Sequence, residues 1–190
     1  ELPQVKFIQS GKNLGFAKAN NLAYRYSSGD LLLFLNPDTE ILGDALSVMC
    51  SCLRSAPEAG GLGCLLLNSD RSIQTSCVQA FPTIWNQVLD ADFLRRLFPR
   101  SPLWGTICLT VTSERGPLPV DSISGACLMV RRAAFEAVGR FDEAFFMYAE
   151  DIEICYRLNK AGYTCYHSNG ARVVHHGGRS SSAQRRSSFS

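Results

Sequence analysis

The chain has 190 residues, of which 46% are hydrophobic and 19% charged, and its formal net charge is +2. These values fit one globular domain and exclude a dedicated nucleic-acid binder, which needs a concentrated basic face. No apolar run is long enough to span a bilayer, and we expect no signal peptide in residues 1–4. The eight cysteines show no zinc-ligand spacing, so we expect reduced, buried thiols in a cytoplasmic protein.

The first third of the chain alternates strand and helix patterns. Leu31 to Leu35 form a short, continuous apolar run, which is typical of a central strand covered on both faces. Around it we expect strands at 5–8 and 61–67 and helices at 17–24 and 44–54. This alternation predicts an α/β fold with a mostly parallel central sheet flanked by helices.

The rest of the chain continues the alternation after a less regular middle. Apolar residues at 84–98 indicate a helix that either packs on the core or touches a membrane or lipid-linked substrate. Residues 179–190 are rich in serine and arginine, so we expect a disordered tail after a domain at 1–178. The other expected elements are strands at 107–111, 120–131, 163–167 and 172–175, and helices at 133–138 and from Glu150 to about 161.

Residues 141–153 are rich in carboxylate and aromatic side chains, with five carboxylates and four aromatic side chains in thirteen residues. Glu150 and Asp151 stand where a helix should begin, because apolar residues follow at helical spacing. The helix dipole alone favours carboxylates in a first turn. The alternative is a catalytic or metal-binding role, since aromatic shielding tunes the pKa of a carboxylate.

Other polar groups follow predicted strands. Asp38 comes directly after the apolar run at 31–35, within Asn-Pro-Asp, which is either a simple turn or a rigid oxygen ligand for Mg²⁺ or Mn²⁺. His175 and His176 end the last strand, and only one of two adjacent strand residues can face a site. With the acidic pair at 150–151, these groups indicate group transfer from a diphosphate-activated donor.

Taken together, these motifs make the sequence similar to a known family. It resembles the family 2 glycosyltransferases with a GT-A fold, especially the bacterial rhamnosyltransferase-like branch. The matching motifs occur in order along nearly the whole chain: Asn13–Asn21, Leu33–Thr39, Asp121–Ala126, Val138–Glu143, Phe145–Arg157 and His175–Ser180.

The resemblance implies a metal site. Asn36-Pro37-Asp38 corresponds to the metal-binding Asp-x-Asp element of the family, so Asp38 should contact the Mg²⁺ or Mn²⁺ ion. Asn36 takes the first place of that element and is expected on the substrate side. His175 matches the metal-linked histidine of the His-x-x-Gly-x-Ser element, with His176 as the alternative.

The resemblance also implies catalytic and binding residues. Asp151 matches the base that deprotonates the acceptor hydroxyl in an inverting, single-displacement transfer, and Glu150 would assist at the acceptor side. Gly125 would let the backbone approach the donor sugar. The residues expected to line the nucleotide side are Asn13, Gly15, Phe16 and Asn20.

The implied donor is a nucleotide sugar, often dTDP-rhamnose, and the implied acceptor is a surface glycan, frequently lipid-linked, at the cytoplasmic face of the membrane.

The first strands that hold the nucleotide base in this family have no counterpart before Val5, and the family continues past the serine-rich end. We therefore expect a chain truncated at the N-terminus and at the C-terminus. Two other functions stay open, a non-catalytic remnant that binds a glycan or partner and a metal-dependent phosphohydrolase.

Overall fold

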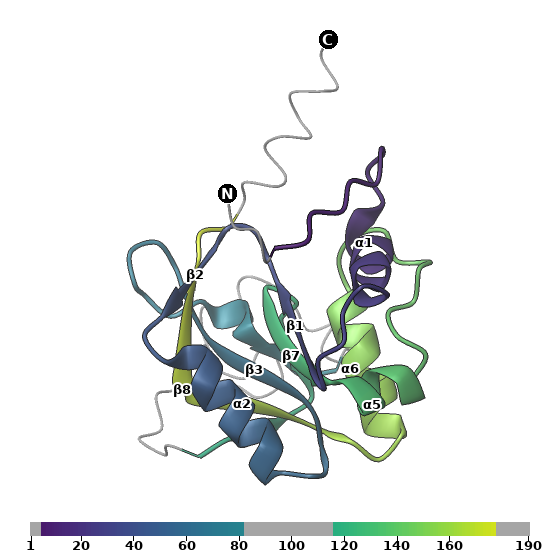
Figure 1. Cartoon of the computed structure of the whole chain (residues 1–190). Coiled ribbons are helices and arrows are strands. Elements are labelled where there is room, and N and C mark those ends of the chain that lie inside the picture. The colour runs from purple at the N-terminus through teal and green to yellow at the C-terminus, as the bar shows by residue number, and fades with distance from the viewer. Residues whose placement is uncertain (1–4, 82–115, 178–190) are drawn as a thin grey trace, which may run out of the picture.

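The computed structural model describes residues 5–81 and 116–177, and it places a central sheet between helices (Figure 1). The helices are α1 (Gly15–Tyr24), α2 (Ala45–Ser55), α5 (Arg132–Ala137), α6 (Glu150–Lys160) and the short 3-10 helix η1 (Thr75–Cys77). The strands are β1 (Leu31–Leu35), β2 (Thr39–Leu42), β3 (Ala59–Leu67), β4 (Val78–Gln79), β5 (Leu118–Val120), β6 (Ser122–Ile123), β7 (Cys127–Arg131) and β8 (Thr164–His175). Among these helices, none is long and apolar enough to cross a membrane.

The main sheet has the strand order β1-β7-β3-β8-β2, and β5 also pairs with β8. Among the described strands, β3 and β8 form the one parallel pair, so the sheet is mixed, whereas the sequence predicted a mostly parallel one. The reason lies at one edge: β7 begins where β1 ends, with Cys127 opposite Leu35, and therefore runs in the opposite direction. Strands β4 and β6 form a separate two-stranded sheet.

The sheet must curl, because β1 and β2 lie at its opposite edges but are joined by three residues only, Asn36 to Asp38. The four Cα–Cα steps from Leu35 to Thr39 span at most about 14 Å. The edges of a flat five-stranded sheet would lie about 19 Å apart. The two edges therefore approach each other at residues 36–38, which concentrates the strand ends there.

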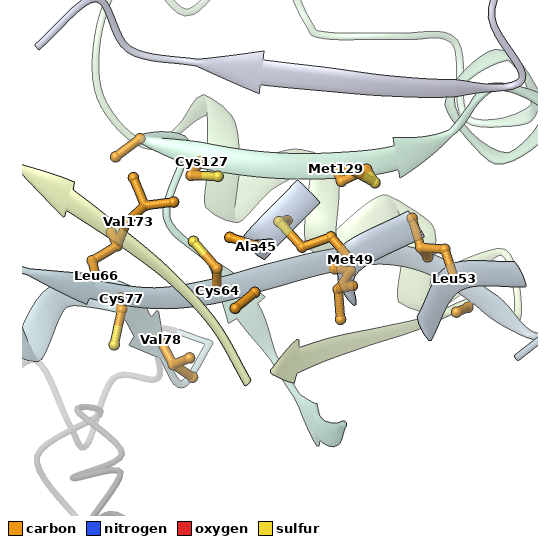
Figure 2. Packing of buried hydrophobic residues seen from close by; sticks show 14 residues of the cluster. Ala45, Met49, Leu53, Cys64, Leu66, Cys77, Val78, Cys127, Met129 and Val173 are labelled. Carbon is orange, nitrogen blue, oxygen red and sulfur yellow. The ribbon is translucent and has the colours of Figure 1, made fainter. Parts of the chain in front are cut away.

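The hydrophobic core lies on both faces of the sheet, as the apolar run of β1 predicted. Leu31 and Leu33 pack against the cluster between α2 and the sheet, whereas Leu32 and Phe34 belong to the cluster under α1, α5 and α6. Figure 2 shows the first cluster, where Met49 of α2 lies near Met129 of β7. The seven cysteines within the described residues are free, and five of them are buried.

Several predicted elements are confirmed and three are corrected. The helices expected at 17–24, 44–54, 133–138 and from Glu150 are present, as are the strands at 31–35 and 61–67. The strand expected at 5–8 is absent; these residues belong to no helix or strand, and Phe7 is 84% exposed. The strand expected at 120–131 is divided, because Asp121 and residues 124–126 lie outside the strands β5, β6 and β7.

The third correction concerns β8, which is one strand where two were expected. Separate strands were expected at 163–167 and 172–175, with polar and glycine residues at 168–170 between them. In the structure a register shift opposite Cys64 and Leu65 absorbs the extra residues, so that the strand continues. The expected helix at 84–98, the strand at 107–111 and the tail at 179–190 lie outside the described residues.

Candidate active site

A cavity of about 620 Å³ opens where the curled sheet meets the start of α6. Its volume lies within the usual range for small-molecule sites. Seven of the ten residues to which the sequence assigned site roles line it: Phe16, Asn36, Asp38, Gly125, Glu150, Asp151 and His175.

Strand pairing brings Asp38 and His175 together. Thr39 at the start of β2 is the register partner of His175 at the end of β8, and the amide of His176 donates a 2.9 Å hydrogen bond to the carbonyl of Asp38. As a result, Nε2 of His175 lies 3.4 Å from Oδ1 of Asp38. His176 points elsewhere, with its Nδ1 2.9 Å from Oγ of Ser69. The structure therefore places His175, and not His176, in the cavity.

The atoms of Asp38 and His175 that face each other fit a divalent cation. Nδ1 of His175 lies 3.0 Å from Oε1 of Gln74, an acceptor, which fits a ring proton on Nδ1 and a lone pair on Nε2 at the cavity side. Oδ1 of Asp38 is buried and has no hydrogen-bond partner, since the 3.4 Å contact with Nε2 is not a hydrogen bond. Nε2 of His175 and Oδ1 of Asp38 are thus two acceptor atoms that face each other with no hydrogen bond between them. Such a pair can bind a cation such as Mg²⁺ or Mn²⁺.

The protein supplies few ligands at this point. Within 5–81 and 116–177, no group of three or more His, Cys, Asp or Glu side chains could hold a metal ion. A cation bound by Asp38 and His175 would therefore complete its coordination with water and with ligand oxygens, which is the usual arrangement for Mg²⁺ beside a phosphate.

The carboxylate of Asp151 is oriented by two backbone amides. Oδ2 accepts a 2.8 Å hydrogen bond from the amide of Gly125, and Oδ1 accepts one of 2.9 Å from Ile152. This explains why the strand expected at 120–131 is interrupted: the backbone at Gly125 leaves the sheet and gives its N–H to Asp151. The cavity therefore contains an oriented carboxylate, as general-base chemistry requires.

Glu150 differs from its neighbour because it is buried. Its residue is 6% exposed, and its Oε2 has no hydrogen-bond partner. Burial raises the pKa of Glu150, and the adjacent Asp151 raises it further. A carboxyl group with a raised pKa therefore lies beside the oriented carboxylate of Asp151.

The loop before α6 holds this acidic pair in a constrained conformation. Tyr148 and Ala149 both have positive φ angles, of 71° and 68°. Such angles are uncommon for residues other than glycine and carry a conformational cost. The amide of Phe16 in α1 donates a 2.9 Å hydrogen bond to the carbonyl of Phe146, which ties the loop to α1.

Three residues expected on the nucleotide side lie outside the cavity lining, namely Asn13, Gly15 and Asn20. Oδ1 of Asn13 accepts a hydrogen bond from the amide of Gly15, and Nδ2 of Asn20 donates to the carbonyl of Phe16. Gly15 packs so closely on Phe146 that a Cβ atom would overlap its carbonyl oxygen. These contacts shape the start of α1, and their role toward a nucleotide stays a prediction.

Other lining residues were assigned no role from the sequence, although Ser124, Met147 and Tyr148 lie within the matching motifs. Ser76, Gln79 and Ser124 add polar side chains to the cavity, and Met147 and Tyr148 add an apolar and an aromatic one. Residues 74–79 belong to no motif, and they reach the cavity only because η1 and β4 pack against the sheet. The aromatic content of 141–153 did indicate Tyr148, although not its place at the cavity.

Sequence comparisons agree with the geometry. A sequence model described as glycosyl transferase family group 2 matches residues 32–187. The chain is 33% identical over 185 residues to an N-acetylglucosaminyl-diphospho-decaprenol L-rhamnosyltransferase of Mycobacterium tuberculosis, covering 92% of this chain and 59% of the relative. It is 28% identical to the rhamnosyltransferase WbbL of Escherichia coli, covering 88% of this chain and 62% of that protein. The chain thus spans about 60% of the length of these relatives.

Solved structures agree on the fold. GalNAc-T7, solved with UDP, GalNAc and Mn²⁺, matches with a TM-score of 0.63 and 14% identity, over 90% of this chain and 32% of that one. The mannosyltransferase PcManGT of Pyrobaculum calidifontis, solved with GDP-Man and Mn²⁺, matches with a TM-score of 0.54 and 19% identity, over 90% and 39%. The predicted GT-A-like α/β fold is confirmed. Because the family model covers most of the sequence, the chain belongs to glycosyl transferase family group 2.

Proposed function

We propose that this chain carries the catalytic part of an inverting, metal-dependent glycosyltransferase. It would move a sugar, rhamnose, from a nucleoside diphosphate to a lipid-linked glycan acceptor at the cytoplasmic face of the membrane. One observation carries the proposal: Asp38 and His175, which fit a cation, line the same cavity as the oriented carboxylate of Asp151.

In the proposed reaction, Asp151 acts as the general base. Its carboxylate takes the proton from the acceptor hydroxyl while that oxygen forms a bond to the anomeric carbon of the donor sugar. The bond between the anomeric carbon and the diphosphate oxygen breaks, and its electron pair leaves with the nucleoside diphosphate. A single displacement of this kind inverts the anomeric configuration.

The cation side of the cavity would hold the leaving group. Asp38 and His175 would bind Mg²⁺ or Mn²⁺, which would neutralise charge on the diphosphate. The Mn²⁺ in the two solved glycosyltransferases supports a metal of this kind. Asn36 lines the same side and donates from Nδ2 to Nε2 of His175 at 3.3 Å, which holds the ring beside Asp38.

The choice of substrates rests on the relatives. Two of them are named as rhamnosyltransferases, and one name specifies a diphospho-decaprenol acceptor that carries N-acetylglucosamine. The cavity volume of about 620 Å³ is typical of small-molecule sites, and Tyr148 in its lining, which is 73% exposed, offers an aromatic ring on which an acceptor sugar would stack.

The test is a transfer assay with dTDP-rhamnose, UDP- and GDP-sugars, and a prenyl-diphosphate-linked N-acetylglucosamine acceptor. We expect product with inverted anomeric configuration by NMR, loss of transfer in EDTA, and recovery with Mn²⁺ or Mg²⁺. Donor hydrolysis at the same rate without acceptor would instead indicate a phosphohydrolase. Donor binding without turnover would support a non-catalytic remnant.

The variant Asp151→Asn tests the assigned base. Its kcat should fall by about 10²- to 10⁴-fold, the usual contribution of general acid–base catalysis, while Mn²⁺-dependent donor binding stays within a few-fold of wild type. Asp142→Asn, at an exposed position outside the cavity lining, is the matched control and should keep full activity. Unchanged transfer by Asp151→Asn would refute the base assignment.

A further inference from the structure

We infer that Gln74 is a positioning residue that holds His175 in the tautomer with an unprotonated Nε2, and that a hydrogen-bond relay from Asp70 orients Gln74. The inference rests on the proposed function in taking Asp38 and His175 as the cation site. It adds a chain of residues behind that site, none of which belongs to a motif in the sequence.

The relay begins at a carboxylate, which can only accept hydrogen bonds when ionised. Oδ1 of Asp70 accepts from the hydroxyl of Ser72 at 2.6 Å and from its amide at 3.0 Å. The hydroxyl hydrogen bond from Ser72 lowers the pKa of Asp70, and the amide hydrogen bond lowers it further. The hydroxyl of Ser72 has one proton and donates it to Asp70. The hydroxyl oxygen can therefore only accept a hydrogen bond from its second neighbour.

That neighbour is Asn68, whose Nδ2 donates to Oγ of Ser72 at 2.9 Å. The opposite end of the same amide, Oδ1, therefore faces Gln74 and accepts from its Nε2 at 3.3 Å. Because Nε2 of Gln74 donates to Asn68, the other end of this amide, Oε1, faces His175. The direction of every hydrogen bond in the chain thus follows from the ionised carboxylate of Asp70.

The backbone fixes the relay in place. The amide of Asn68 donates to the carbonyl of Ser72, and the amide of Gln74 donates to the carbonyl of Leu66 in β3. Leu67 also forms an isolated bridge with Ile73. Since β3 pairs in parallel with β8, with Leu67 opposite Val174, this turn lies beside the end of β8 that carries His175.

The consequence appears at the cavity. Oε1 of Gln74 accepts from Nδ1 of His175 at 3.0 Å, so the proton of the neutral ring is on Nδ1. Nε2 is then an acceptor: it lies 3.3 Å from Nδ2 of Asn36, which can donate to it, and 3.4 Å from Oδ1 of Asp38. In the other tautomer Nε2–H could donate to Asp38, and the two ligands would satisfy each other and compete with a cation.

The test uses the full 190-residue chain and two readouts. Long-range ¹H–¹⁵N NMR at pH 8 in the absence of metal reports which imidazole nitrogen carries the proton, and the chain has three histidines, so the signals can be assigned from single variants. Mn²⁺ titration followed by EPR gives the Kd. We expect wild-type His175 to be protonated at Nδ1 and not at Nε2.

The variant Gln74→Met keeps the length of the side chain but removes the acceptor. We expect it to shift His175 toward the Nε2–H tautomer and to raise the Kd for Mn²⁺ by about 10- to 100-fold, as for other outer-shell partners of metal ligands. Gln74→Glu keeps an acceptor and should retain the wild-type tautomer. Ser69→Ala, which removes the partner of His176 in the same turn, should leave both readouts of His175 unchanged.

Either of two results would overturn the inference. One is an Nε2–H tautomer of His175 in the wild-type chain, which needs no variant and no metal. The other is a Gln74→Met protein with the wild-type tautomer and a Kd within twofold of wild type. If wild type binds no Mn²⁺ while the tautomers behave as expected, the proposed cation site fails and the positioning role of Gln74 stands.

Discussion

The backbone amide of Gly125 lies 2.8 Å from Oδ2 of Asp151, and position 125 has no side chain to separate them. A Cβ atom there would stand 3.4 Å from Cβ of Asp151 and 3.4 Å from the ring of Phe16. These distances are at the short limit of ordinary van der Waals contact, so the added atom would lie directly against Asp151 and Phe16. One glycine thus couples the interrupted strand to the orientation of the proposed base.

This coupling makes Gly125→Ala a sensitive variant. We expect it to fold, because the φ angle at 125 is not in the left-handed region. The methyl group should displace Asp151, and because displacements of about 1 Å can cost about 10²-fold in rate, kcat should fall at least about tenfold. Steady-state kinetics measures kcat, and urea denaturation measures the free energy of unfolding, so a loss of activity can be told apart from a loss of stability. Gly116→Ala, where nothing lies within 4 Å of the new Cβ, should leave both unchanged.

Much of this architecture could be predicted from local sequence. The apolar run of β1 predicted a strand buried on both faces, and Leu32 and Leu33 indeed pack into different clusters. The acidic pair at 150–151 was expected to open a helix, and α6 begins at Glu150. These predictions succeeded because periodicity and end signals depend on neighbours in the chain.

Other features could not be predicted, because they depend on pairing between distant segments. Hydrophobic patterning does not reveal strand direction, so the antiparallel arrangement of β1 and β7 was missed. The interruption at Gly125 serves a hydrogen bond to Asp151, which lies 26 positions away. Gln74 reaches His175 only through the register of β3 and β8, and a polar residue after a turn carries no signal of such a contact.

The buried carboxyl of Glu150 predicts a gain in stability on its replacement. Its raised pKa means that the folded state holds a proton that the unfolded state releases above pH 4.5. Stability therefore falls as the pH rises from 4.5 through the folded-state pKa. Glu150→Gln should be more stable than wild type at pH 7, by of order 1 kcal/mol, or about 2–4 °C in Tm.

Thermal unfolding at pH 7 and at pH 4.5 checks this expectation. The advantage of Glu150→Gln should shrink as the pH falls toward 4.5, because wild type then recovers its proton. The control is Glu40→Gln, at an exposed carboxylate 3.6 Å from Arg71, which should change stability by less than about 0.5 kcal/mol. A Glu150→Gln protein that is less stable at pH 7 would contradict the assignment of a costly buried charge.

Gly15 connects α1 to the loop that carries the acidic pair. It has a φ angle of +73°, and a Cβ atom there would overlap the carbonyl oxygen of Phe146. Gly15→Ala should therefore lower the free energy of unfolding by about 2–4 kcal/mol through strain and overlap together. Urea denaturation measures this loss. Gly43→Ala, with φ of +55° but nothing within 4 Å, isolates the strain and should cost about 1 kcal/mol. Equal losses in the two variants would mean that the contact with Phe146 contributes nothing.

His167 gives the fold a dependence on mildly acidic pH. Its side chain is fully buried in β8, and burial lowers its pKa to about 4, against an ordinary value of 6.5. Between these values the unfolded chain binds a proton at this residue that the folded chain does not bind. Stability should therefore decline as the pH falls from 6.5 to 4, by up to about 3 kcal/mol at 1.36 kcal/mol per pH unit.

Denaturation of wild type and His167→Leu across this range isolates that contribution. The variant lacks the titrating ring, so its free energy of unfolding should vary less between pH 6.5 and 4, and its stability relative to wild type should improve as the pH falls. His176→Leu, which leaves His167 in place, should keep the wild-type slope. Parallel curves for wild type and His167→Leu would mean that His167 binds a proton equally well in the folded and the unfolded state. That result would contradict the prediction, because the ring is buried beside Asn169 and its Nδ1 has no hydrogen-bond partner.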